Sequence, residues 1–337
     1  MEQTASPEAY SWFIRGRALF DFGNFQTTAR AITYFEKAVD ADPDYAIAWG
    51  HLAYAQLSTM QWQPFEFASS AAIPAYEKAL ALNPRQSEAL ATQALAIQIL
   101  DHDWETAGEL YQRAIDAEAS SNAMQLYAIW YLQNIGQAEK AIQLINVEAE
   151  ERDPLHAGYK ANLALLYLWT GNATAAARKA REALELNPQH QFALAALIDA
   201  YVATENYTGV KQILERTPPA MQDHPRIRAR VALSYVSQGD YAKAGEIYRE
   251  LLEIELTRSY QGLPITAQLA LSLGEVEKAI DLMEMAVDLN MWNQFWTASL
   301  FRKNEAVKDH PRYLAHLRRM RLDDESLAEL QRRMSFD

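Results

Sequence analysis

The chain has 337 residues, of which 50% are apolar, so it can bury a large core in two ordinary domains or in one elongated array. A formal net charge of −13 argues against nucleic acid or an anionic membrane as the main partner, because phosphate groups favour Lys and Arg. The sequence has no Cys, which excludes disulfides, thiolate zinc sites and cysteine nucleophiles.

The N-terminal residues MEQTASPEAY have neither the basic nor the apolar segment of a signal peptide. No apolar run reaches the roughly 18 residues that a membrane span needs. We therefore expect no direct membrane insertion by this chain. A cytoplasmic location is expected for the chain as it stands, and a periplasmic one if it is a module cut from a membrane-anchored protein.

Helical hairpins are predicted in succession from about residue 9 to about residue 290. The stretch YFEKAVDADPDYAIAW at 34–49 returns at 75–90 as AYEKALALNPRQSEAL. Further along, Pro154 and Pro188 are separated by nearly the same interval as Gly136 and Gly171. Between these marks apolar residues recur at i, i+3, i+4 and i+7, with Gly at the turn and Pro after the second helix. A fixed period of roughly 34 residues indicates a stacked array of helical pairs.

Several segments depart from the period. Extra residues lie between the helices of the first pair, in DFGNFQTTAR, and of the second pair, in STMQWQPFEFASS. The sixth repeat ends in Pro218-Pro219, so an irregular joint is expected near 205–225. After Asn290 the period stops, and residues 310–320 and 324–334 are predicted to be capping helices, since an array exposes an apolar face at each end.

The repeated positions resemble the tetratricopeptide repeat family, whose pattern combines apolar, small and aromatic residues on the first helix with Ala, an aromatic, Ala and Pro on the second. The fifth repeat supplies Leu163, Ala164, Tyr167, Gly171, Ala176, Ala183 and Pro188, and the first supplies Trp12, Gly16, Ala31, Phe35, Ala38 and Pro43. This resemblance implies an all-α fold: a right-handed α-solenoid, or superhelix, of about eight hairpins at 9–290 with C-terminal capping helices at 291–337. We expect residues 1–337 to form a single domain.

The order of landmarks resembles one bacterial subfamily more closely. The segments AYSWFIRGRALF, DHDWETAGELYQRAI and DHPRYLAHLRRMRL are similar to the C-terminal repeat region of membrane-anchored winged-helix transcription regulators and adenylate cyclases. The resemblance implies a sensory or interaction module of a bacterial signalling protein that binds a protein or peptide. The alternative is a free-standing scaffold or adaptor for assembling a protein complex.

Catalytic and cofactor motifs are absent from the sequence, which has no GxxxxGK, GxGxxG, HExxH or GxSxG. We therefore expect no enzyme and no cofactor. The acidic stretch 40–44 lacks the Gly and Glu of a calcium loop, and a turn is the better interpretation. Three histidines, His156, His190 and His224, recur with the period of the repeats. Neighbouring hairpins lie roughly 10 Å apart, too far to share one ion, so no metal site is expected.

A stripe along the first helix of each hairpin is the main candidate for partner binding. In the family this face lines the concave side, and its residues here are unusually apolar and aromatic: Tyr10, Phe13, Arg17, Phe20, Tyr54, Leu57, Leu126, Trp130, Phe192 and Asp199. One interpretation is a groove for an extended peptide or a partner helix. The other is that these residues close the inner side of the superhelix. The Lys and Asn pattern of chaperone-binding members is not present.

Two further segments carry alternatives. Trp62, Phe65 and Phe67 in the second connection either form an exposed contact or fold back on their own hairpin. The segment 302–321 holds seven basic and two acidic residues. Its arginines either stabilise a cap helix through the helix dipole, or contact the acidic N-terminal half of a second copy and give a homodimer.

Overall fold

The computed structural model describes residues 4–20, 25–117, 120–257, 263–291, 293–302 and 304–334, and within these ranges the regular structure is helical with no strand. Contacts divide the chain into two compact units. The first unit is Met1–Tyr127 with Leu289–Trp292 and Asp324–Asp337, and the second is Ala128–Asp288 with Asn293–Asp323. The division does not fall at the irregular joint expected near 205–225. That the two units form a single domain stays a prediction.

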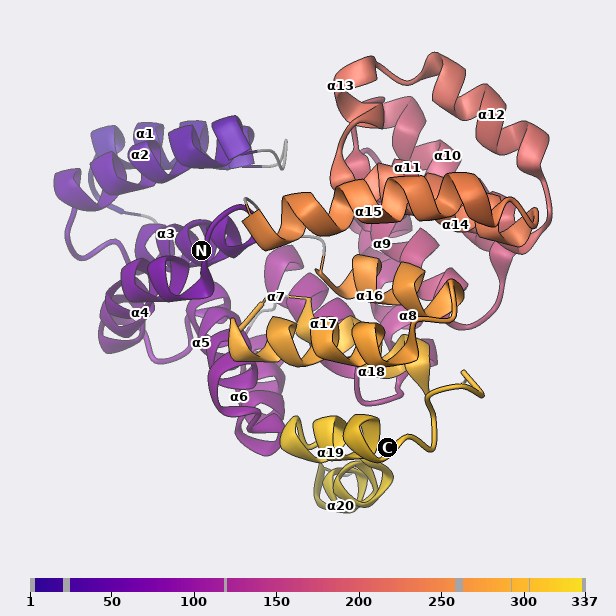
Figure 1. The fold of residues 1–337 in the computed structure, drawn as a ribbon. Helices are drawn as coiled ribbons and strands as arrows, with labels where there is room; N and C mark the ends of the chain where they lie inside the picture. Colours follow the sequence, from indigo (N-terminus) through magenta and orange to yellow (C-terminus); the bar gives the residue numbers. More distant parts are fainter. Residues whose placement is uncertain are drawn as a thin grey trace. The chain divides into compact units, whose positions relative to one another are not determined.

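The first unit consists of helical pairs (Figure 1). Its helices are α1 (Pro7–Phe20), α2 (Phe25–Ala41), α3 (Ala46–Ser58), α4 (Phe65–Leu82), α5 (Ser87–Asp101), α6 (Trp104–Asp116), α7 (Ser121–Leu126) and the C-terminal α20 (Asp324–Met334). Within each pair the two helices pack together, and α3 also packs on α5, and α5 on α7. The helix α20 packs against α6, where Arg333 Nη1 lies 2.8 Å from Glu105 Oε2.

The second unit continues the same pairing. Its helices are α8 (Ala138–Val147), α9 (Ala157–Trp169), α10 (Ala173–Leu186), α11 (Gln191–Ala203), α12 (Tyr207–Arg216), the short α13 (Pro219–Gln222), α14 (Pro225–Ser237), α15 (Tyr241–Thr257), α16 (Leu263–Ser272), α17 (Val276–Asp288), α18 (Gln294–Phe301) and α19 (Pro311–Arg319). The first helices of successive pairs pack on one another in the order α9, α11, α14, α16 and α18. We call the first helix of each pair an A helix and the second a B helix. The fold is an all-α repeat solenoid.

In several pairs the turn from the A helix to the B helix contains a left-handed residue, and glycine supplies it at four places. Gly136, Gly171, Gly239 and Gly274 have φ values of 84°, 81°, 78° and 85°. Because glycine has no Cβ, it adopts this conformation without the steric cost that other residues meet. The glycine period in the sequence is therefore the period of this turn.

In these turns the residue after the left-handed position is the N-cap and immediately precedes the first residue of the B helix. Asn172 Oδ1 accepts a hydrogen bond from the Ala175 N–H at 3.1 Å, and Asn206 and Asp103 cap their helices in the same way. Such a cap satisfies a backbone donor that the helix itself cannot. The left-handed residue and the side-chain cap together determine where the B helix starts.

The turn from a B helix to the next A helix is set by an Asp or Asn before proline. Asp42 Oδ1 accepts from the Asp44 N–H, Asn83 Oδ1 from the Arg85 N–H, and Asn187 Oδ1 from the Gln189 N–H, at 2.9–3.1 Å. This is the local side-chain turn that Asx residues favour. The acidic stretch 40–44 therefore contains the end of α2 and the turn between repeats, and residues 42–44 form that turn as predicted.

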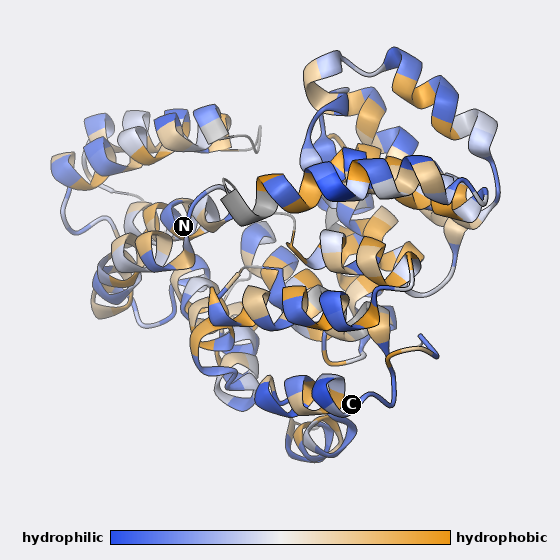
Figure 2. Cartoon of the chain, in the orientation of Figure 1, coloured by the Kyte–Doolittle hydropathy of each residue, from blue (hydrophilic) through white to orange (hydrophobic). Residues whose placement is uncertain are grey.

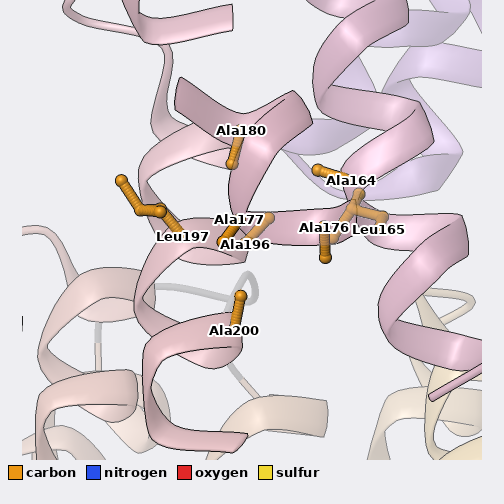
Figure 3. Packing of buried hydrophobic residues seen from close by; sticks show 8 residues of the cluster. All are labelled: Ala164, Leu165, Ala176, Ala177, Ala180, Ala196, Leu197 and Ala200. Atoms are coloured by element: carbon orange, nitrogen blue, oxygen red, sulfur yellow. The ribbon is translucent and has the colours of Figure 1, made fainter. Parts of the chain in front are cut away.

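Small residues occupy the helix crossings of the second unit. Figure 3 shows the cluster, in which every side chain is at most 8% exposed: Ala164 and Leu165 from α9, Ala176, Ala177 and Ala180 from α10, and Ala196, Leu197 and Ala200 from α11. Alanine lets two backbones approach closely, while the larger Tyr167, Leu184 and Phe192 pack around the cluster. Along a single helix, hydrophilic and hydrophobic residues alternate in the colouring of Figure 2, as expected for helices with one buried side.

The regions outside the repeat pattern differ in part from expectation. The capping region contains α18 in addition to the two predicted helices, and α18 packs on α16 as a further A helix would. Two π-helical turns, Tyr127–Leu132 and Glu148–Arg152, interrupt the fourth pair.

The extra residues of the first connection lie outside the described residues. None of the described helices is both long and apolar enough to cross a membrane.

Candidate functional site

In the first unit the predicted stripe begins on α1. Tyr10 is 45% exposed and Arg17 is exposed, with its guanidinium 5.9 Å from the centre of the Phe13 ring. Phe13 itself is 4% exposed and packs against Phe35, Tyr45 and His51. Tyr10 and Arg17 thus reach solvent, whereas Phe13 belongs to the packing between the first two pairs.

Further along the stripe the exposure falls. Phe20 and Tyr54 are half-buried and meet edge to face, with ring centres 5.2 Å apart. Leu57 has no exposed surface and Leu126 is 2% exposed. The part of the stripe that a partner could contact in this unit therefore consists of Tyr10, Arg17, Phe20 and Tyr54.

The aromatic residues of the second connection separate in the structure. Only Trp62 lies in the connection, at the end of a 3-10 turn, whereas Phe65 and Phe67 lie in the first turn of α4. Phe65 is 3% exposed and packs inward, and Phe67 is 63% exposed. Phe67 and, in part, the half-buried Trp62 are thus the residues of this group that a partner could reach.

In the second unit the stripe contributes Trp130, Phe192 and Asp199. Trp130 lies in a π-helical turn and is 9% exposed, and its carbonyl accepts a hydrogen bond from Asn134 Nδ2 at 2.8 Å. Phe192 and Asp199 are half-buried, on the same face of α11. Phe192 and Asp199 therefore carry the accessible part of the stripe here.

Two arginines of α14 complete this part of the surface, which we call the arginine cluster: Phe192, Asp199, Arg226 and Arg230. The Arg226 guanidinium lies over the Phe192 ring, 4.2 Å from its centre. Arg230 Nε donates to Asp199 Oδ2 at 2.8 Å, and Arg230 Nη1 donates to the Arg226 carbonyl at 3.2 Å. Arg226 and Arg230 are 7% and 8% exposed.

The arginine cluster shifts the ionisation of its members. Burial raises the pKa of the Asp199 carboxyl, although the guanidinium of Arg230 opposes this shift. Burial, and then the like charge of Arg230, lower the pKa of Arg226 to about 9. Neither arginine was among the residues predicted from the sequence. The available signal was the period, because Arg226 follows Phe192 by one repeat length and so takes its place in the next repeat.

The three periodic histidines are the N-cap residues of α9, α11 and α14. His190 Nδ1 accepts from the Ala193 N–H and His224 Nδ1 accepts from the Arg226 N–H, each at 3.2 Å. Burial, and then His156, lower the pKa of His190 to about 4, and burial with Arg226 and Arg230 lowers the pKa of His224 to about 4. Both rings must be neutral to accept these bonds. No group of three or more metal-binding side chains occurs in the described ranges.

The basic cap is paired within its own unit. On α19, Arg312 reaches three carboxylates of α17, those of Glu277, Asp281 and Glu284, at 2.6–2.8 Å. Arg319 Nη1 lies 2.6 Å from Asp288 Oδ1 at the end of α17. These contacts attach α19 to α17, so part of the positive charge of the cap already has an acidic partner in the same molecule.

The comparisons with known proteins bear on the repeats themselves. Three family models, each described as a tetratricopeptide repeat, match residues 15–59, 167–233 and 225–257. The chain contains tetratricopeptide repeats. The match at 167–233 spans the whole arginine cluster, so this candidate surface lies within a recognised stretch of tetratricopeptide repeats.

Solved structures share the fold at low sequence identity. The human IFIT1 dimer with PPP-AAAA is 17% identical, with a TM-score of 0.59 over 83% of this chain and 72% of that one. A monomeric mutant of IFIT1 with Gppp-AAAA is 15% identical, with a TM-score of 0.62 over 93% of this chain and 71% of that one. Pseudomonas aeruginosa PilF is 18% identical, with a TM-score of 0.48 over 72% of this chain and 99% of that one. No curated protein matches the chain.

Proposed function

We propose that this protein is a non-catalytic scaffold whose A helices bind a protein partner through an extended peptide or a helix. Tetratricopeptide arrays commonly present binding surfaces along one face of the stacked repeats. The observation that carries the proposal is the arginine cluster, where a half-buried aromatic ring and charged side chains meet on neighbouring A helices. Aromatic and Arg side chains in such settings contribute most of the binding energy at protein interfaces.

The charge of the chain supports a protein partner over a nucleic acid. With 44 acidic and 31 basic residues the chain carries a net negative charge, which repels a phosphate backbone. A peptide can instead use a local positive site together with apolar contacts. The absence of nucleic-acid binding stays a prediction, since the similarity to IFIT1 bears on fold alone.

The biological setting is proposed from the bacterial subfamily that the sequence resembles. We place the chain as the sensory or interaction module of a signalling or transcription-regulatory protein. A free-standing adaptor is the alternative. The coding sequence upstream of Met1 distinguishes them: a membrane span and an output domain favour the module, and a ribosome-binding site favours the adaptor.

A homodimer through the basic cap stays a separate proposal, which the pairing of Arg312 and Arg319 within the unit does not require. Light scattering at low and at high salt measures it directly. A monomer under both conditions rules the dimer out.

Peptide selection tests the binding function. Peptides selected from a random display library on the purified protein should lose at least about tenfold in affinity when the stripe residue of the unit that they bind, Tyr54 or Phe192, is replaced with Ala. Tyr241→Ala is the matched control, because Tyr241 is 59% exposed on a B helix. Thermal melting checks that each variant is folded. Equal affinity for the wild type and both stripe variants would contradict the proposal.

A further inference from the structure

One side of an A helix packs on the pair that precedes it in the array. On α11 this side includes Ala196, Leu197 and Ala200, which are buried in the cluster that they share with α9 and α10 (Figure 3). On α14 it includes Arg226 and Arg230, whose side chains contact residues of α11. The preceding pair therefore covers this side of both helices.

On α1 the same side is open to solvent. In the register of the repeats, Ile14, Arg15 and Ala18 take the places of the three α11 residues, and Tyr10 and Ser11 lie one turn earlier on the same side. All five residues are exposed, Tyr10 at 45% and Ile14 at 39%. We call Tyr10, Ser11, Ile14 and Ala18 the open face of α1. Arrays carry polar residues where such a side meets solvent, so large apolar side chains here indicate a surface that a partner covers.

Two arginines border the open face. The helical repeat places Arg15 on one side of it and Arg17 on the other, and both are exposed. The Arg15 guanidinium lies 4.7 Å from the centre of the Trp12 ring, and the Arg17 guanidinium lies 5.9 Å from the centre of the Phe13 ring. A ring beneath each guanidinium helps to hold its charge at the border of the face. The open face is thus apolar along its middle and basic at both sides.

We propose that the open face of α1 binds an acidic amphipathic helix of a partner protein. A helix is the fitting occupant, because this side of an A helix packs on other helices within the array. An apolar line on the partner fits Tyr10 and Ile14, which lie one helical turn apart. Acidic flanks on the partner fit Arg15 and Arg17. The open face shares only Tyr10 with the stripe of the proposed function, and the inference does not rest on that function.

A second copy of the chain fits the open face less well. In a two-fold contact through this face, α1 would pack on the α1 of the other copy. That helix would bring two further arginines and a single carboxylate, Glu8, to the contact. Charge therefore favours a partner helix that has acidic residues on both sides of its apolar line.

Selected helical peptides provide the test. The displayed library holds a line of Leu residues constant and varies the flanking positions among Glu, Gln and Lys. Peptides selected on the wild type should carry Glu at their flanks, and Ile14→Asp should weaken their binding at least about tenfold. Leu100→Asp is the matched control, because Leu100 is 42% exposed on an A helix of the same unit. Thermal melting checks that both variants are folded.

Arginine variants test the charge preference. Arg15→Gln with Arg17→Gln should remove the preference for Glu over Gln at the flanks of the peptide. Arg113→Gln with Arg181→Gln changes the net charge equally, at exposed positions on two B helices, and should retain the preference. High salt should reduce the preference in the wild type, because it screens exposed charges. An undiminished preference for Glu in the α1 variant would overturn the assignment to an acidic helix.

The absence of Cys from the sequence allows the bound peptide to be located directly. Ser11→Cys places a single thiol on the open face, and Ser70→Cys places one at an exposed position of α4. At a peptide concentration of about ten times the Kd, alkylation of the Ser11→Cys variant should slow about tenfold, and that of Ser70→Cys should not change. Unchanged alkylation of the Ser11→Cys variant would overturn the inference.

The remaining outcomes separate this inference from the proposed function. Helical peptides whose binding falls with Tyr54→Ala or Phe192→Ala, but not with Ile14→Asp, would support the stripe and overturn the open face as a site. Failure to select any helical peptide would overturn the inference and leave the stripe, which random peptides test, unaffected. A wild-type dimer in light scattering that Ile14→Asp dissociates would assign the face to a second copy and overturn the partner helix.

Discussion

At the scale of single residues, the left-handed turn position shows how the repeat tolerates exceptions. Four repeats place glycine there, but Glu205 occupies it in the sixth repeat with φ 54°, and His102 in the third with φ 50°. A residue with a Cβ pays about 1–2 kcal/mol in this conformation. The cap that follows, Asn206 or Asp103, is kept in both repeats, so the turn forms in spite of this strain.

Replacing Glu205 with glycine should therefore stabilise the protein. We expect Glu205→Gly to raise the free energy of unfolding by about 1 kcal/mol, because the backbone strain disappears. The Glu205 side chain is exposed, so few contacts are lost with it. Urea unfolding of both variants measures the change, and Gly171→Ala should lower the same quantity by a similar amount. If Glu205→Gly destabilised the protein, the turn strain would not be the dominant effect.

The histidine caps predict a loss of stability in acid. The native pKa values of His190 and His224, about 4, lie below the ordinary value of 6.5, so the unfolded state takes up protons first as the pH falls. Their contribution to the free energy of unfolding is complete above about pH 6.5. It is lost as the pH falls from about 6.5 to about 4, and the loss reaches up to about 3 kcal/mol for each histidine. Urea midpoints at pH 7 and pH 4.5 measure it. His190→Asn with His224→Asn keeps capping side chains that do not titrate, and should flatten the pH dependence. If the double variant lost as much stability between pH 7 and pH 4.5 as the wild type, the histidine caps would not cause the loss.

At the scale of helices, the small residues at the crossings determine how closely A and B helices approach. Ala176 on α10 has no exposed surface within the alanine-rich cluster. Ala176→Leu should destabilise the protein by about 1–3 kcal/mol, because the extra carbons force neighbouring helices apart. Thr174→Leu is the control, on the exposed side of the same helix. Thermal unfolding of the two variants should differ clearly, and equal melting temperatures would show that the crossing is loosely packed.

The sequence predicted helices where two signals coincide. Gly at the A-to-B turn and Pro after the B helix gave the positions of the helical pairs. The helix α18 was missed because no such pair of signals follows Asn290, and the π-helical turns because an extra residue in a helix leaves no mark in its composition.

The candidate surface was predictable only in part. Helical periodicity placed Phe13, Leu57 and Leu126 on one stripe with Tyr10 and Tyr54, but periodicity cannot say which of them the neighbouring repeat covers. Arg226 and Arg230 escaped prediction because their role depends on contacts with α11, the preceding A helix.

At the scale of the whole molecule, the chain is an all-α repeat solenoid, and the proposed function assigns binding to its A helices and support to its B helices. The accessible aromatic residues of the stripe and the arginine cluster lie on A helices in both units. By contrast, two B helices make structural contacts. The helix α10 contributes alanines to the buried cluster, and α17 forms ion pairs with α19.

Hydrogen exchange in the presence of a selected peptide tests this assignment most directly. Mass spectrometry should show slower backbone exchange in A helices, above all in α11 and α14, with B helices such as α10 and α15 unchanged. Phe192→Ala should weaken that protection at a fixed peptide concentration, and Tyr241→Ala should not. Protection confined to B helices would contradict the account.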